Sequence, residues 1–162
     1  MNISVSIHSK SDDEYRIILS SFDLDIIPCE IREQFGDSIE IVEVTLERAK
    51  GNNPTGIEIL LKISNIIGEV LNDNENMILY FYCDDMHDIA RRDKGLTPQK
   101  FRSTLFSRMF DKYILSNGIT DMINTPIEIK ADRHIYIHLT SRDTHLEYVN
   151  AIKSAIVEME SK

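Results

Sequence analysis

One run of seven residues, "MILYFYC" (77–83), leaves few options for the fold of this chain. A strand with one face in water alternates apolar and polar residues, and this run shows no such alternation. It therefore predicts a strand in the interior of a sheet, covered on both faces by other parts of the chain.

Other strands are predicted on both sides of this run. Residues 39–47 are rich in Ile and Val, but their apolar positions change phase between Ile41 and Val42, which we interpret as a β-bulge. The remaining segments alternate apolar and polar residues and form two predicted hairpins, 3–7 with 15–19 and 126–130 with 134–139.

Three longer segments carry apolar residues at helical spacing: 55–71, 97–115 and about 142–160. Thr55, with Glu58 three residues later, predicts a capping box at the start of the first helix. Thr97 and Pro98 predict the N-cap and the first turn of the second helix. The stretch 28–37 predicts one helical turn, closed by Gly36 as a C-cap.

The predicted order is β-β-β-α-β-α-β-β-α. We expect an α+β fold with a single mixed, largely antiparallel sheet and helices packed on it. We see no internal repeat or linker, so residues 1–162 are expected to form one globular domain.

Composition narrows the class of protein. The formal net charge of -9 disfavours nucleic acid as a partner, and no apolar run reaches the roughly 20 residues that span a bilayer. The N-terminus lacks the features of a signal peptide. Cys29 and Cys83 lie far apart in the sequence, which favours two free thiols, although a disulfide between them stays open. We expect a soluble, cytoplasmic protein.

Residues 84–94 directly follow the predicted interior strand and carry acidic, basic and imidazole side chains. The carboxyl end of such a strand is a common place for ligands in open sheets. Asp84, Asp85 and Asp88 could hold a divalent metal through their oxygens, with His87 as a further ligand or a proton carrier. This stretch is therefore a candidate catalytic site.

Basic residues gather in the same region. Arg91, Arg92, Lys94 and Arg102 could bind an anion together with the free N–H groups at the start of the predicted 97–115 helix. These residues and the carboxylates would suit metal-assisted chemistry on a phosphate.

A simpler interpretation of the same residues is favoured. The carboxylates would end the strand and pair with the basic side chains at the surface, where each ion pair contributes about 0–1 kcal/mol. Cys83 is interpreted as a small core residue rather than a nucleophile. His134 and His138 lie on the same side of a predicted strand and could share a metal, but a polar sheet face is favoured because no third ligand is evident.

The strings "YFYCDD", "RR", "FRS" and "LFSRMF" in this region resemble an uncharacterised family of small soluble proteins found mainly in Bacteroidetes bacteria. The resemblance implies a bacterial, single-domain protein. It carries over no catalytic residue, since the family has no assigned activity.

Two functions stay open from the sequence, and a third, nucleic-acid binding through the basic residues of 91–112, is disfavoured by the negative charge of the remaining chain. The favoured one is a non-catalytic domain that binds another protein or itself, of an immunity type or a regulatory type, with its acidic body meeting a basic partner. The alternative is a metal-assisted enzyme or sensor that acts on a phosphate-bearing small molecule or nucleotide at residues 84–94. We predict no cofactor, and a divalent metal only under the alternative.

Overall fold

The computed structural model describes residues 2–22, 25, 27–35, 38–83 and 95–160 of the 162-residue chain. These residues form a six-stranded sheet with the order β1-β2-β3-β4-β6-β5, together with α-helices and one short 3-10 turn. The strands are β1 (Asn2–His8), β2 (Glu14–Ser21), β3 (Glu40–Lys50), β4 (Met77–Tyr82), β5 (Met122–Lys130) and β6 (His134–Arg142). The helices are α1 (Cys29–Phe35), α2 (Ile57–Asp73), α3 (Pro98–Asn117) and α4 (Leu146–Glu160).

The sheet is mixed, as predicted. β3 and β4 run parallel, and every other neighbouring pair of strands is antiparallel. Both predicted hairpins are present, β1 with β2 and β5 with β6. The α+β class is therefore confirmed, and the order of elements is as predicted except that the short turn expected in 28–37 is the seven-residue helix α1.

The interior position of the "MILYFYC" run is also confirmed. β4 lies between β3 and β6 in the sheet. Met77, Leu79 and Phe81 pack into the core on one face, and Ile78 is fully buried in the core on the other face. Both faces are covered, which explains why the run carries no polar alternation.

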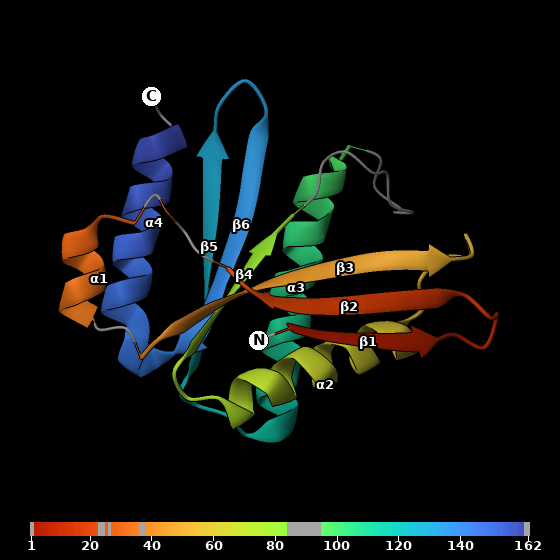
Figure 1. Cartoon of the computed structure of the whole chain (residues 1–162). Coiled ribbons are helices and arrows are strands. Elements are labelled where there is room, and N and C mark those ends of the chain that lie inside the picture. Colours follow the sequence, from red (N-terminus) through yellow and green to blue (C-terminus); the bar gives the residue numbers. More distant parts are fainter. Residues whose placement is uncertain (1, 23–24, 26, 36–37, 84–94, 161–162) are drawn as a thin grey trace.

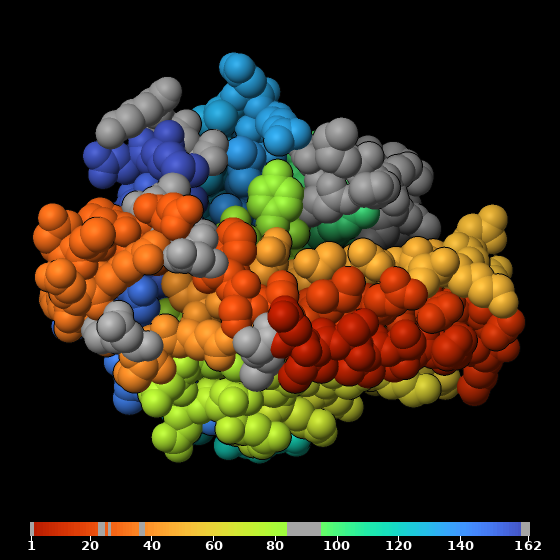
Figure 2. Space-filling model, in the orientation of Figure 1, coloured from red at the N-terminus to blue at the C-terminus, as the bar shows by residue number. Residues whose placement is uncertain are grey.

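Helices cover the two faces of the sheet. α2 and α3 pack on the face that carries Val42 and Leu79, whereas α4 packs on the opposite face over β5 and β6, with α1 beside α4 (Figure 1). The strands β1, β2 and β3 extend beyond the helices of that second face, so their outer surface is open in Figure 2.

The predicted β-bulge in residues 39–47 is wrong. The register of β3 against β2 is continuous from Val42 to Glu47, and its one shift lies near the end of the strand, opposite Glu14 and Tyr15. Ile41 and Val42 are both buried because this part of β3 is covered on both faces, Ile41 beneath α1 and α4 and Val42 beneath α2 and α3. Burial on both faces, and not a β-bulge, therefore explains why two adjacent positions of this strand are apolar.

The capping box predicted at Thr55 is also wrong. α2 begins at Ile57 with Gly56 as N-cap, and no side chain caps it. The Thr55 hydroxyl instead contacts Tyr15 and Arg48 in the neighbouring strands. By contrast, Thr97 caps α3 as predicted, since its Oγ1 accepts a hydrogen bond from the Lys100 N–H at 3.3 Å.

Two predictions from composition can be compared with the described residues. Cys29 is exposed and Cys83 is buried, and both are free thiols. Among the described helices, none has the length and apolar character needed to cross a membrane.

Candidate functional site

A cleft opens where β3 and β4 separate. Their pairing ends at Glu43 and Tyr80, but β3 continues along β2 as far as Lys50 while β4 continues along β6. α2 and α3 contact each other beneath this gap. The resulting space, which we call the β3–α3 cleft, has a volume of about 1070 Å³.

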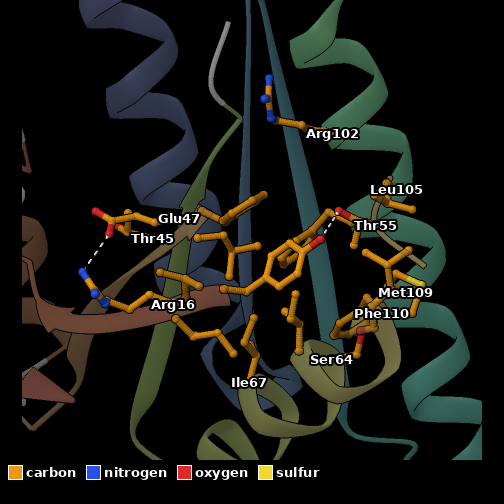
Figure 3. A pocket seen from close by; sticks show the side chains of 18 of the residues that line it. Arg16, Thr45, Glu47, Thr55, Ser64, Ile67, Arg102, Leu105, Met109 and Phe110 are labelled. Carbon is orange, nitrogen blue, oxygen red and sulfur yellow. Dashed lines mark hydrogen bonds and ion pairs between the residues drawn. The ribbon is translucent and has the colours of Figure 1, made fainter. Parts of the chain in front are cut away.

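The walls of the β3–α3 cleft are mostly apolar. Val44 and Leu46 of β3 line the cleft. α3 contributes Leu105, Met109 and Phe110 (Figure 3). Leu46 is 40% exposed, which is high for a leucine in a strand. Apolar side chains thus remain open to this space from two separate elements.

The end of the cleft beside residues 51–55 is polar. The Arg48 guanidinium lies 5.0 Å from the centre of the Tyr15 ring and donates to the Thr55 hydroxyl at 2.8 Å. The Tyr15 hydroxyl also lies within hydrogen-bond distance of Thr55, at 3.0 Å. These contacts hold the Arg48 charge in place with neutral partners.

The loop at this end requires glycine. Gly51 has a φ of +93°, and a Cβ built on it would lie 1.5 Å from the Oδ1 atom of Asp13. Asp13 is 2% exposed and accepts a hydrogen bond from Asn53 at 3.3 Å. The loop can therefore pack directly against the end of the β1–β2 hairpin.

The base of the cleft is the crossing of α2 and α3. Gly68 of α2 faces Tyr113 of α3 so closely that an added Cβ would lie 2.3 Å from the ring. Tyr113 is 9% exposed and lines the cleft. Glycine at this position lets the two helices approach, because the ring packs on the helix backbone.

Of the residues predicted to form a site, Arg102 is in the described part of the chain. It lies on the α3 wall, at the end of the cleft away from Ile67 (Figure 3). Its charge acts on the thiol of Cys83, which directly follows β4, although burial dominates and raises the pKa of Cys83 to about 12. Cys83 is 1% exposed, so it is a core residue as predicted and stays a neutral thiol at physiological pH.

The other predicted site residues lie in 84–94, outside the described residues: Asp84, Asp85, His87, Asp88, Arg91, Arg92 and Lys94. The catalytic and anion-binding roles suggested for them therefore stay predictions. In the described residues, no group of three or more His, Cys, Asp and Glu side chains is placed to hold a metal.

A buried polar network joins α3 to β5 and β6. His138 is fully buried, with its Nε2 atom 2.9 Å from the Ser103 hydroxyl and its Nδ1 atom 3.0 Å from the Oδ1 atom of Asn124. Asn124 donates to the Ser107 hydroxyl at 3.4 Å. The ring of Phe106 lies 4.7 Å from the His138 ring. The expectation that His134 and His138 lie on a polar sheet face is therefore wrong for His138.

The arrangement of Ser103, His138 and Asn124 is that of a nucleophile, a base and an orienting group, but its chemistry fits a structural role. Burial lowers the pKa of His138 to about 4, which makes it a weak base at neutral pH. Ser103 lies inside α3, where backbone N–H groups bond within the helix and cannot stabilise an oxyanion. None of the three residues lines the cleft. The network instead fastens α3 to the sheet.

Sequence reasoning missed both the network and the cleft. Ser103 and Ser107 are four residues apart, which places them on one face of a helix, and this spacing was the available signal for the network. The cleft had no local signal, because it depends on where the pairing of β3 with β4 ends.

No protein family, curated protein or solved structure matches this chain. The resemblance to the Bacteroidetes family therefore stays a prediction.

Proposed function

We propose that this protein is a non-catalytic domain that recognises another protein through the β3–α3 cleft. The observation that carries the proposal is a mostly apolar cleft of about 1070 Å³ between β3 and α3. Exposed apolar side chains gathered in one place are typical of interaction sites. The immunity-type or regulatory role and the cytoplasmic location that we expect from the sequence belong to this proposal.

The chemistry of the lining favours binding over catalysis. Among the described residues, the lining contains no Cys, His or Asp, and both of its glutamates, Glu43 and Glu47, lie on the outer face of β3. Glu47 pairs there with Arg16 at 3.5 Å, pointing away from the cleft (Figure 3). The inner walls offer apolar contacts, hydroxyl groups and arginine side chains, a set that is common at protein interfaces.

A pair of matched substitutions on α3 tests the proposal. Leu105 lines the cleft, whereas Leu115 is 81% exposed and does not. We expect Leu105→Lys to weaken binding to a partner by about tenfold or more, because it places a charge in an apolar contact. Leu115→Lys makes the same chemical change on the same helix and should leave the affinity unchanged.

The partner would be captured from an extract of the source organism and then purified. Its affinity for the wild type and both variants would be measured by calorimetry with purified components. Capture alone does not decide the matter. Equal affinity of the wild type and Leu105→Lys would contradict the proposal, provided that the variant retains the wild-type melting temperature.

The alternative function is a metal-assisted enzyme or sensor that acts at residues 84–94. One observation supports it, the position of Arg102 near the end of β4. A thermal-shift screen with divalent metals, nucleotides and phosphate separates the two functions. A ligand present at 100 times its dissociation constant would stabilise the chain by about 2.7 kcal/mol. We expect no such shift, and a shift that is lost in Asp84→Asn would favour the enzyme or sensor over the binding domain.

A further inference from the structure

The edge of β3 that borders the cleft carries backbone groups that no other strand pairs with in the described part of the chain. The direction of these groups follows from two hydrogen bonds. The Ile41 carbonyl accepts from Phe22 N–H on the β2 side, and the Glu40 N–H donates to the Asn76 carbonyl on the β4 side. Even-numbered residues of β3 therefore direct their N–H and C=O groups away from β2.

This alternation reaches the cleft without interruption, because the register against β2 is continuous through Glu47. Pairing with β4 ends at Glu43 and Tyr80. Beyond that point, the N–H and C=O of Leu46 and the N–H of Arg48 face the open side. The side chain of Leu46 points toward the same space. A strand edge and an apolar wall thus border one cleft.

We infer that the partner inserts an extended segment into the β3–α3 cleft and adds it as a strand to β3 at Leu46. This inference rests on the proposed function and specifies how the partner binds. Hydrogen bonds to the β3 backbone would hold the segment, and its alternate side chains would contact the apolar wall of α3.

Local charge indicates the composition of that segment. The whole chain has a net charge of -9, but the inner wall of the cleft that β3 forms carries the positive charge of Arg48. The hydrogen bonds of Arg48 go to neutral oxygens of Asn53 and Thr55. A segment with apolar residues at alternate positions and a carboxylate at one end complements this surface.

The other edges of the sheet are less suited to adding a strand. β5 carries Pro126, which lacks a donor, and a proline is one way in which protein edges are blunted. β1 packs chiefly on β2, so a strand added at its edge would have no apolar helix wall to contact. Val44, Thr45 and Leu46 of β3 are β-branched or apolar, and no proline interrupts the strand.

The probe for this inference is a displayed library of random linear 12-residue peptides. We expect the selected peptides to alternate apolar residues and to carry Asp or Glu near one end. Each peptide would then be N-methylated at one position at a time, and its affinity for the wild-type protein measured by calorimetry. Strand addition predicts a loss of about tenfold or more at every second central position, with little loss between.

A pair of variants at one position gives an independent test. Leu46→Pro removes the N–H that faces the cleft without removing a hydrogen bond to β2, so the strand should be retained. Leu46→Ala removes most of the side chain but keeps the N–H. We expect Leu46→Pro to bind the peptides at least about tenfold more weakly than Leu46→Ala.

The outcomes separate this inference from the proposed function. Peptides that tolerate N-methylation at every central position, yet lose affinity for Leu105→Lys, would overturn strand addition and leave a cleft-binding protein. Selection of no peptide would also overturn strand addition. Binding that is insensitive to both Leu105→Lys and Leu46→Pro would place the interface elsewhere and overturn the function as well.

Discussion

Substituting Gly68 with alanine is expected to destabilise the protein by about 1–3 kcal/mol, although alanine is the better helix former. The added Cβ would lie 2.3–2.6 Å from three atoms of the Tyr113 ring, closer than packed carbon atoms approach. Because Tyr113 is 9% exposed, the ring has to move or the helices have to separate. Urea unfolding at constant pH measures the change in free energy of unfolding.

The effect of Gly68→Ala on stability should have the opposite sign in a protein that already carries Tyr113→Ala. In Tyr113→Ala the space beside Gly68 is open, so Gly68→Ala should stabilise the chain by up to about 1 kcal/mol through helix propensity. Comparing the two backgrounds isolates the contact between residue 68 and the ring. Stabilisation by Gly68→Ala in the wild-type background would show that α2 and α3 do not cross at this position. It would contradict the assignment of this crossing as the base of the β3–α3 cleft.

Acidification is expected to destabilise the protein through His138. Burial lowers the pKa of His138 from 6.5 to about 4. Between these two values the unfolded chain binds a proton that the folded chain does not bind, so the folded state loses stability as the pH falls. The loss attributable to this group is about 2–3 kcal/mol between pH 7 and pH 4.5. It is complete below the folded pKa, where both states are protonated.

His138→Gln serves as the control, because glutamine does not titrate but can still hydrogen bond with Ser103 or Asn124. Urea unfolding of both proteins at pH 7 and pH 4.5 gives the pH dependence of each. The wild type should lose about 2–3 kcal/mol more than the variant over this interval. Equal losses would show that His138 binds protons in the folded state as readily as in the unfolded state. That result would contradict the burial of His138 in the network.

Predictions from the sequence were correct where a pattern depends on burial or on local backbone geometry and not on contacts with particular distant residues. The apolar run at 77–83 needs only coverage on both faces, and β4 has that coverage. The Thr97–Pro98 start of α3 depends on local backbone geometry. The two hairpins follow from alternation and a short connection. All of these elements were predicted correctly.

Predictions failed where distant residues decide the outcome. Thr55 had the spacing of a capping box, but contacts with Tyr15 and Arg48 on the neighbouring strands engage its hydroxyl. The apolar phase of β3 changed because two layers of helices cover Ile41 and Val42 from opposite sides. His138 was expected at a polar sheet face and is buried beneath α3. Each error reflects tertiary contacts that a local pattern does not contain.

Only one described residue that lines the candidate site, Arg102, was predicted from the sequence. Sequence reasoning selected the region after β4, and Arg102 from that selection lines the cleft. The helical spacing of apolar residues in 97–115, among them Leu105, Met109 and Phe110, indicates an apolar helix face but not what covers that face. Their exposure to a cleft results from the length of the β3–β4 pairing, which is a property of the assembled sheet.

Hydrogen exchange of the backbone amides, measured for the protein alone and bound to its purified partner, tests most directly where the partner binds. The proposal predicts slower exchange on binding in residues 44–48 and 101–113, the two walls of the β3–α3 cleft, and unchanged exchange in α4. Protection confined to α1 and α4, or to β1, with no change in the cleft would contradict it.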